Sequence, residues 1–132
     1  MKTTRVLIVE DDYASLYLMQ RILKGKYKID TSTNSADGFD KTQANNYDVI
    51  VMDINLGKGL DGVELTREIR KRAEHSKIPI IAVTAYASDP TRKKSMEAGC
   101  NDFITKPINK EKLILLIEKY LQKGRISPMF HD

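Results

Sequence analysis

Short apolar runs alternate along this chain with longer stretches in which apolar residues recur at every third or fourth position. The first pattern is typical of strands buried in a parallel sheet, and the second of helices that pack on a sheet. The predicted strands are Arg5 to Val9, Tyr27 to Thr31, Tyr47 to Met52, Ile78 to Val83 and Asp102 to Thr105. The predicted helices are Tyr13 to Leu23, Ala36 to Ala44, Val63 to Ala73, Pro90 to Ala98 and Lys110 to Gln122. Five strand–helix units predict an α/β fold of three layers, in which helices cover both faces of a parallel sheet.

Polar residues mark the expected starts of several helices. Asp61, followed three residues later by a glutamate, has the capping-box pattern. Asp89 is expected to cap the fourth helix, with Pro90 at its first position. Asn109 is expected to cap the fifth helix, and Asp12 to cap the first, since acids favour that end of a helix.

Acidic residues, a hydroxyl and a lysine stand where the predicted strands end. They are Glu10, Asp11 and Asp12 after the first strand, Asp53 after the third, Thr84 after the fourth and Lys106 after the fifth. A doubly wound sheet with strand order 2-1-3-4-5 would bring the ends of the first and third strands together at its ligand-binding edge. Carboxylates at the end of a buried strand are costly unless a cation or a lysine compensates their charge. The pattern therefore predicts a cation-dependent anion site.

The composition is that of one ordinary globular domain. The chain has 132 residues, of which 41% are hydrophobic and 30% are charged, so it can bury a core without disulfides or metals. The net charge of +4 is scattered, and neither nucleic acid nor a membrane is expected as a partner. A single cysteine and the lack of a signal-peptide pattern predict a cytoplasmic protein.

Residues 1–123 are expected to form the domain and residues 124–132 a short tail, because a glycine and a proline follow the last predicted helix. His75 and His131 are expected on the surface, away from any ligand site. Cys100 is expected to be a small buried residue and not a nucleophile.

Four short motifs occur in order, each at the end of a predicted strand: V-E-D-D, V-M-D, V-T-A and K-P-I. On these motifs, residues 4 to 123 resemble a response-regulator receiver domain of the two-component signalling systems. The resemblance implies the flavodoxin-like (βα)5 fold, a cis peptide bond between Lys106 and Pro107, and a Mg²⁺-dependent phosphoryl transfer from a phosphohistidine donor. It also implies that the chain is not an independent enzyme, since it would only accept, and slowly hydrolyse, its own phosphoryl group.

The resemblance implies a role for each residue of the predicted site. Asp53 would be the phosphoacceptor, whose carboxylate attacks phosphorus. Asp11 and Asp53 would ligate Mg²⁺ or Mn²⁺ directly, and Glu10 through a water molecule. The backbone carbonyl of Asn55 would add a further ligand. Lys106 would pair with the phosphoryl oxygens.

Thr84 and Phe103 would form a switch that carries the effect of phosphorylation to the fourth helix, the fifth strand and the fifth helix. Tyrosine is frequent in this family where Phe103 stands, so the coupling is expected to differ. Asn55 and Tyr86 would tune hydrolysis, with Tyr86 shielding the acyl phosphate. Gly57 stands where receivers usually carry proline, in a glycine-rich loop that is expected to be mobile.

The partners implied are a histidine kinase or phosphotransfer domain upstream and a protein partner downstream. Tyr13 and Tyr17 are expected near the site entrance, where they could meet the donor. Ile114 and Leu115 lie off the best apolar face of the fifth helix. They would either face a partner, including a second copy bound through helix 4, strand 5 and helix 5, or pack on the core. A stand-alone receiver, the receiver of a hybrid kinase and part of a regulator with an output domain all fit the sequence.

Two other functions are compatible with the same fold. A flavodoxin-like FMN electron carrier would need a hydroxyl-rich phosphate loop where Glu10, Asp11 and Asp12 stand, and these acids would repel the phosphate. An aspartyl-phosphate phosphatase or phosphotransferase would use Asp11 or Asp12 as the nucleophile in place of Asp53. Yellow purified protein would indicate the first function, and a phosphoryl group on a strand-1 aspartate the second.

Overall fold

The computed structural model describes residues 3–57, 59–86 and 88–125. Five strands form within these residues: β1 (Arg5–Val9), β2 (Lys28–Ser32), β3 (Val49–Asp53), β4 (Ile80–Thr84) and β5 (Asp102–Thr105). Five α-helices alternate with them: α1 (Tyr13–Leu23), α2 (Ser35–Ala44), α3 (Gly62–Arg70), α4 (Asp89–Ala98) and α5 (Lys110–Arg125). A short 3-10 helix, η1 (Ala73–His75), follows α3. None of the helices in this part of the chain combines the length and the apolar character needed to cross a membrane.

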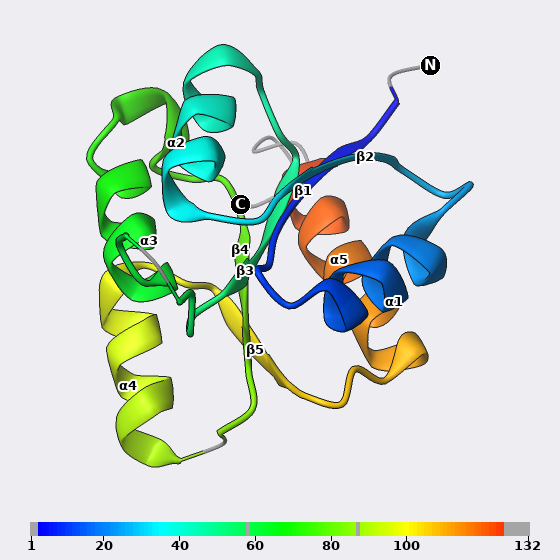
Figure 1. Cartoon of the computed structure of the whole chain (residues 1–132). Coiled ribbons are helices and arrows are strands. Elements are labelled where there is room, and N and C mark those ends of the chain that lie inside the picture. The colour runs from blue at the N-terminus through cyan, green and yellow to red at the C-terminus, as the bar shows by residue number, and fades with distance from the viewer. Residues whose placement is uncertain (1–2, 58, 87, 126–132) are drawn as a thin grey trace, which may run out of the picture.

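The strands form one parallel sheet in the order β2-β1-β3-β4-β5, which confirms the predicted order and the flavodoxin-like fold. Helices α1 and α5 cover one face, and α2, α3 and α4 cover the other (Figure 1). In the sheet, Val9 of β1 lies opposite Met52 of β3, and Asp53 lies opposite Val83 of β4. The carboxyl ends of the three central strands therefore lie side by side at one edge, where ligands bind in folds of this type.

The central strands are buried on both faces, which explains their continuously apolar sequences. In β1, Val6 and Ile8 belong to the apolar cluster with α1 and α5, whereas Leu7 and Val9 belong to the cluster on the opposite face. Every residue of β3 and of β4 is buried. The edge strand β2 is mostly half-buried, as its more polar sequence predicts.

Side-chain caps begin three helices where the sequence predicts them. The Asp61 carboxylate accepts a hydrogen bond from the N–H of Glu64, and the Glu64 carboxylate accepts one from the N–H of Asp61, so the capping box forms. Asp12 caps α1, and the Asn109 side chain accepts a hydrogen bond in the first turn of α5. These caps fix where each helix begins after its loop.

Several other boundaries differ from the prediction. Ser88, and not Asp89, caps α4, because the Ser88 hydroxyl accepts the hydrogen bond from the N–H of Thr91. Strands β3 and β4 begin two residues later than predicted. Helix α3 ends at Arg70, and the chain then turns into η1. Helix α5 continues to Arg125, and the rest of the predicted tail lies outside the described residues.

The prediction that His75 lies on the surface is wrong, since only 3% of this residue is exposed. The guanidinium group of Arg70 donates a hydrogen bond of 2.9 Å to the carbonyl oxygen of His75, which holds η1 against the end of α3. The backbone of His75 is therefore held close to α3, and its side chain is covered. Cys100 is buried, as predicted, and His131 lies outside the described residues.

Gly62 begins α3 in very close contact with the end of β3. A Cβ atom at this position would lie 2.1 Å from the carbonyl oxygen of Asp53 and 2.5 Å from Cα of Ile54. No side chain fits at such distances, so glycine is required here by the close approach. The Gly62 N–H also donates to the Ile54 carbonyl oxygen over 3.2 Å. Helix α3 can therefore start directly against the residues that carry the candidate site.

Candidate functional site

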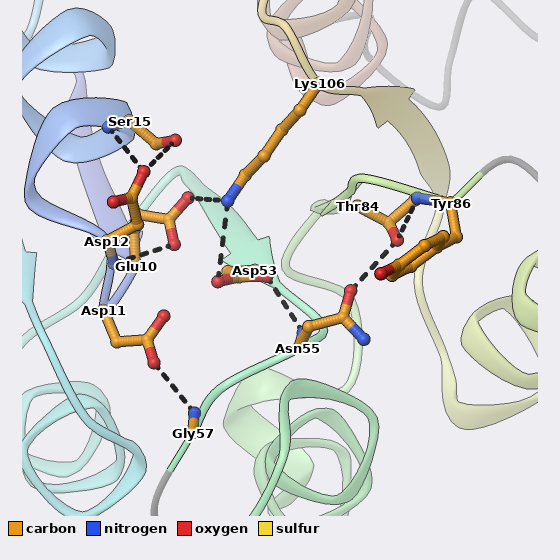
Figure 2. A network of polar contacts seen from close by, with 10 residues as sticks. All are labelled: Glu10, Asp11, Asp12, Ser15, Asp53, Asn55, Gly57, Thr84, Tyr86 and Lys106. Atoms are coloured by element: carbon orange, nitrogen blue, oxygen red, sulfur yellow. Dashed lines mark hydrogen bonds and ion pairs between the residues drawn. The ribbon is translucent and has the colours of Figure 1, made fainter.

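Three carboxylates meet at the carboxyl edge of the sheet. Glu10 and Asp11 directly follow β1, and Asp53 is the last residue of β3. Each offers an oxygen atom, and these three oxygens lie within 4.8 Å of one another. Figure 2 shows the cluster, with the Lys106 side chain reaching toward Glu10 and Asp53 from beyond the end of β5. The structure thus brings together the acids and the lysine that the sequence placed at separate strand ends.

Lys106 compensates part of the negative charge in this acid cluster of Glu10, Asp11 and Asp53. Its Nζ lies 2.9 Å from Glu10 Oε1 and 3.9 Å from Asp53 Oδ2, and Glu10 is fully buried. Burial alone would lower the pKa of Lys106, but the hydrogen bond to Glu10 and the charge of Asp53 outweigh burial and raise it. The lysine therefore stays charged. Its peptide bond to Pro107 is cis, as the resemblance implied.

The environment of Asp53 favours its neutral form. Burial raises the pKa of Asp53, and the hydrogen bond and negative charge of Glu10 raise it further. The N–H of Asn55, which donates to Asp53 Oδ1 over 2.9 Å, and the charge of Lys106 lower it. The balance raises the pKa of Asp53 to about 7. The charge of Lys106 is therefore not enough to keep Asp53 fully ionised at neutral pH.

The donor set of the acid cluster suits a hard divalent cation. Its candidate ligand atoms are carboxylate oxygens, which Mg²⁺ and Mn²⁺ prefer over nitrogen or sulfur. The raised pKa of Asp53, caused by burial and by Glu10, is consistent with a deficit of positive charge at this point. A divalent cation among Glu10, Asp11 and Asp53 would supply that charge and favour the ionised form of Asp53.

Asp12 serves the helix and not the acid cluster. Its Oδ2 accepts hydrogen bonds from the N–H of Ser15 over 3.0 Å and from the Ser15 hydroxyl over 2.6 Å. These hydrogen bonds lower the pKa of Asp12. The prediction that Asp12 is a helix cap is confirmed.

Asp11 is held by the loop that follows β3. Its Oδ2 accepts a hydrogen bond of 2.8 Å from the backbone N–H of Gly57 (Figure 2). The sequence pattern identified Gly57 only as a departure from the usual proline. It gave no sign of this contact, since the backbone of any residue except proline can donate such a bond.

A second set of polar contacts joins the ends of β3 and β4. The hydroxyl of Thr84, a fully buried residue, donates to Asn55 Oδ1 over 3.0 Å and accepts from the N–H of Tyr86 over 3.0 Å. The Thr84 hydroxyl thus links the Asn55 side chain to the backbone of Tyr86, on the opposite side of Asp53 from Glu10 in Figure 2. Tyr86 is 66% exposed. The Thr84 hydroxyl already has partners, so a new acceptor in the site must compete with Asn55.

Phe103, the predicted switch residue, lies opposite Ala82 in the sheet, two positions before the ends of β4 and β5. Its side chain is buried in the apolar cluster on the α2, α3 and α4 face of the sheet. The guanidinium group of Arg92 lies over its ring, 4.9 Å from the centroid. Phe103 is therefore turned inward in this structure and makes no direct contribution to the acid cluster.

Comparison with known proteins identifies relatives of this arrangement. Residues 6–118 match the family model of the response regulator receiver domain. The chain is 31% identical over 129 residues to the transcriptional regulatory protein ResD of Bacillus subtilis, covering 97% of this chain and 52% of ResD. It is also 31% identical over 125 residues to the osmosensing histidine protein kinase SLN1 of Saccharomyces cerevisiae, covering 89% of this chain and 10% of SLN1. The chain thus spans about half, or less, of the length of these curated relatives.

A solved structure with a similar fold is the receiver domain of the sensor histidine kinase PA1611 from Pseudomonas aeruginosa. It superposes with a TM-score of 0.85 and is 29% identical, covering 92% of this chain and 99% of that domain. That structure has a magnesium ion coordinated in its active-site cleft.

The raised pKa of Asp53 predicts how stability should depend on pH in the metal-free protein. A folded-state pKa of about 7, above the unfolded value of 3.8, means that the folded protein binds this proton more tightly. Stability should therefore fall as the pH rises through that range. We expect Asp53→Asn to raise the free energy of unfolding at about pH 8, on the order of a few kcal/mol, and to change it little at about pH 4.

Urea unfolding in EDTA at both pH values measures this effect. Asp12→Asn is the matched control, because the pKa of Asp12 is lowered by its bonds to Ser15 and its replacement should bring no gain at high pH. Equal stability of Asp53→Asn and the wild-type protein at both pH values would contradict the raised pKa.

Proposed function

The chain belongs to the response-regulator receiver domain family, and we propose that Asp53 is its phosphoacceptor. The donor would be a phosphohistidine of a histidine kinase or of a phosphotransfer domain. The observation that carries the proposal is the position of Asp53 at the end of β3, in a cluster with two other carboxylates and beside Lys106. A carboxylate that attacks a negatively charged phosphoryl group needs positive charge close by, and this cluster can gather it.

In the proposed reaction, a carboxylate oxygen of Asp53 attacks the phosphorus atom of the donor. The new O–P bond forms as the P–N bond breaks, and the histidine nitrogen leaves with the electron pair. The nucleophile is the ionised carboxylate, so the raised pKa of Asp53 must first be brought down by positive charge. Tyr13 and Tyr17, which are exposed on α1, would contact the donor.

The residues of the site fit Mg²⁺ or Mn²⁺ as the source of that charge. Asp11 and Asp53 would ligate the ion directly, Glu10 through a water molecule, and Asn55 through its backbone carbonyl. With Lys106, the two charges of the ion balance the three carboxylates, and phosphorylation leaves the site about one charge more negative. The magnesium ion in the PA1611 receiver supports this assignment.

Phosphorylation would redirect two side chains whose present partners are known. The Lys106 ammonium would leave Glu10, now 2.9 Å away, to pair with a phosphoryl oxygen. The Thr84 hydroxyl would exchange Asn55 Oδ1 for another phosphoryl oxygen and draw the loop after β4 inward. Phe103, now covered by Arg92, would respond to that movement and shift the population of states on the α4, β5 and α5 surface.

The surface formed by α4, β5 and α5 would be bound by a downstream partner or by a second copy of the chain. Met96 on α4 and Leu115 on α5 are both exposed, the latter by 69%. Ile114, by contrast, packs against the apolar cluster with α1 and α5, which leaves Leu115 as the residue of this pair available to a partner. The relatives include a transcriptional regulator and a histidine kinase. The domain that binds this surface would therefore lie either in the same polypeptide or in a separate protein.

Incubation with Mg²⁺ and acetyl phosphate is expected to place a phosphoryl group on Asp53, and peptide mapping by mass spectrometry would locate it. EDTA and Asp53→Asn should each abolish the modification. Asp12→Asn should retain it, because the Asp12 carboxylate is engaged in capping α1. A phosphoryl group on Asp11 or Asp12 would contradict the proposal and would favour a phosphatase-like mechanism with a strand-1 nucleophile.

Tyr86 and Asn55 would set the lifetime of the acyl phosphate. Because the Tyr86 backbone is joined to Asn55 through the Thr84 hydroxyl and its side chain is exposed, the ring would restrict the approach of water. Tyr86→Ala is therefore expected to shorten the half-life of phosphorylated Asp53 several-fold, whereas Tyr86→Phe keeps the ring and should stay close to wild type. The decay of the acyl phosphate after removal of the donor measures this effect. An unchanged half-life in Tyr86→Ala would refute the role of the ring.

A further inference from the structure

The contact between Gly57 and Asp11 joins two segments that are far apart in the sequence. The donor is a backbone N–H in the loop between β3 and α3, and the acceptor is the Oδ2 atom of a carboxylate that follows β1. A hydrogen bond to a charged acceptor is stronger than one between neutral groups. It therefore has the strength to fix the orientation of the Asp11 carboxylate.

The residues from Ile54 to Leu56, which lead into Gly57, are held by the sheet and the core. The N–H of Ile54 donates to the Val83 carbonyl oxygen over 3.0 Å, and the Ile54 carbonyl oxygen accepts from the N–H of Gly62 over 3.2 Å. Leu56, the residue before Gly57, is buried in the apolar core. The chain on the N-terminal side of Gly57 is therefore held in place independently of the bond to Asp11.

A glycine at position 57 leaves just enough space for the carboxylate. A Cβ atom at Gly57 would lie 3.0 Å from Asp11 Oδ2, a tight contact that would push the carboxylate away by a few tenths of an ångström. The other oxygen of Asp11 points toward the side of Glu10 and Asp53 (Figure 2). One oxygen is thus bound to the loop, and the other faces the acid cluster.

We propose that Gly57 is a positioning residue that makes Asp11 a one-oxygen ligand and thereby favours Mg²⁺ over Ca²⁺ in the acid cluster. Mg²⁺ requires near-octahedral geometry with single oxygen atoms, whereas Ca²⁺ accepts more ligands and often binds both oxygens of a carboxylate. A hydrogen bond to a ligating carboxylate also holds it in place for the metal. The inference rests on the proposed function only in that this cluster binds a divalent cation.

The test compares Gly57→Pro with Gly57→Ala, because both add a Cβ atom near Asp11 and only proline removes the N–H. Bound Mn²⁺ is measured by electron paramagnetic resonance, and Mg²⁺ or Ca²⁺ is then added as a competitor. We expect the Mg²⁺ dissociation constant of Gly57→Pro to exceed that of Gly57→Ala by about tenfold. The Ca²⁺ dissociation constant should change less, so that the ratio of the Ca²⁺ constant to the Mg²⁺ constant becomes smaller in Gly57→Pro. In an Asp11→Ala background the two variants should bind alike.

Two results separate the failure of this inference from the failure of the proposed function. If the wild-type protein binds Mg²⁺ through Asp11 but the Pro and Ala variants have equal affinities, the positioning role of Gly57 is wrong and the phosphoacceptor proposal stands. If Asp11→Ala binds Mg²⁺ as tightly as the wild-type protein does, the metal site itself is wrong. Both the positioning role of Gly57 and the proposed function, as stated, are then wrong.

Amide hydrogen exchange of Gly57 gives a second test that needs no change in the loop. The Gly57 amide should exchange more slowly in the metal-free wild-type protein than in Asp11→Ala, since the carboxylate is its acceptor. Equal exchange rates would overturn the inference even if Gly57→Pro failed to fold.

Discussion

The gathering of three carboxylates at one edge of the sheet, two of them buried, is the constraint on which the rest of the site depends. Glu10 is fully buried and Asp53 nearly so, although like charges at this separation repel each other and lose their hydration. The ion pair of Lys106 with Glu10 offsets part of this cost, and a pKa of about 7 lets Asp53 avoid a further part. A site that is short of positive charge in this way attracts a divalent cation. The same cation would favour the ionised form of Asp53, which must act as the nucleophile. Binding of the cation would therefore also make Asp53 reactive.

The surrounding fold makes this arrangement possible without a loss of packing. After Arg5, strand β1 is apolar on both faces, as is β3, and the acids appear only where these strands end. Gly62 allows α3 to begin against the carbonyl oxygen of Asp53, and the N–H of Gly57 reaches the carboxylate of Asp11 from the same loop. One short segment after β3 therefore serves two purposes. It closes the core through buried apolar residues, and it supplies backbone groups that position the acids.

Most of this fold and of its site could be predicted from the sequence, because both follow from patterns that repeat along the chain. Continuous apolar runs separated by helices specify a parallel sheet, and parallel strands bring their carboxyl ends to one edge. What the sequence did not predict depends on backbone groups or on a choice between equivalent side chains. Ser88 and Asp89 can both cap a helix, and only the path of the chain decides between them. His75 is buried by a turn that has no sequence signal, and Lys106 has two acids within reach but contacts Glu10 more closely.

The central claim is that the acid cluster lacks positive charge until a divalent cation binds, and the pKa of Asp53 measures this directly. Carboxyl-carbon NMR of the selectively labelled protein, titrated with and without saturating Mg²⁺, reports that value. The account predicts a pKa of about 7 in the metal-free protein and a shift of more than one unit downward when Mg²⁺ is present. A pKa near the ordinary value of 3.8 without metal, or one that Mg²⁺ leaves unchanged, would contradict it.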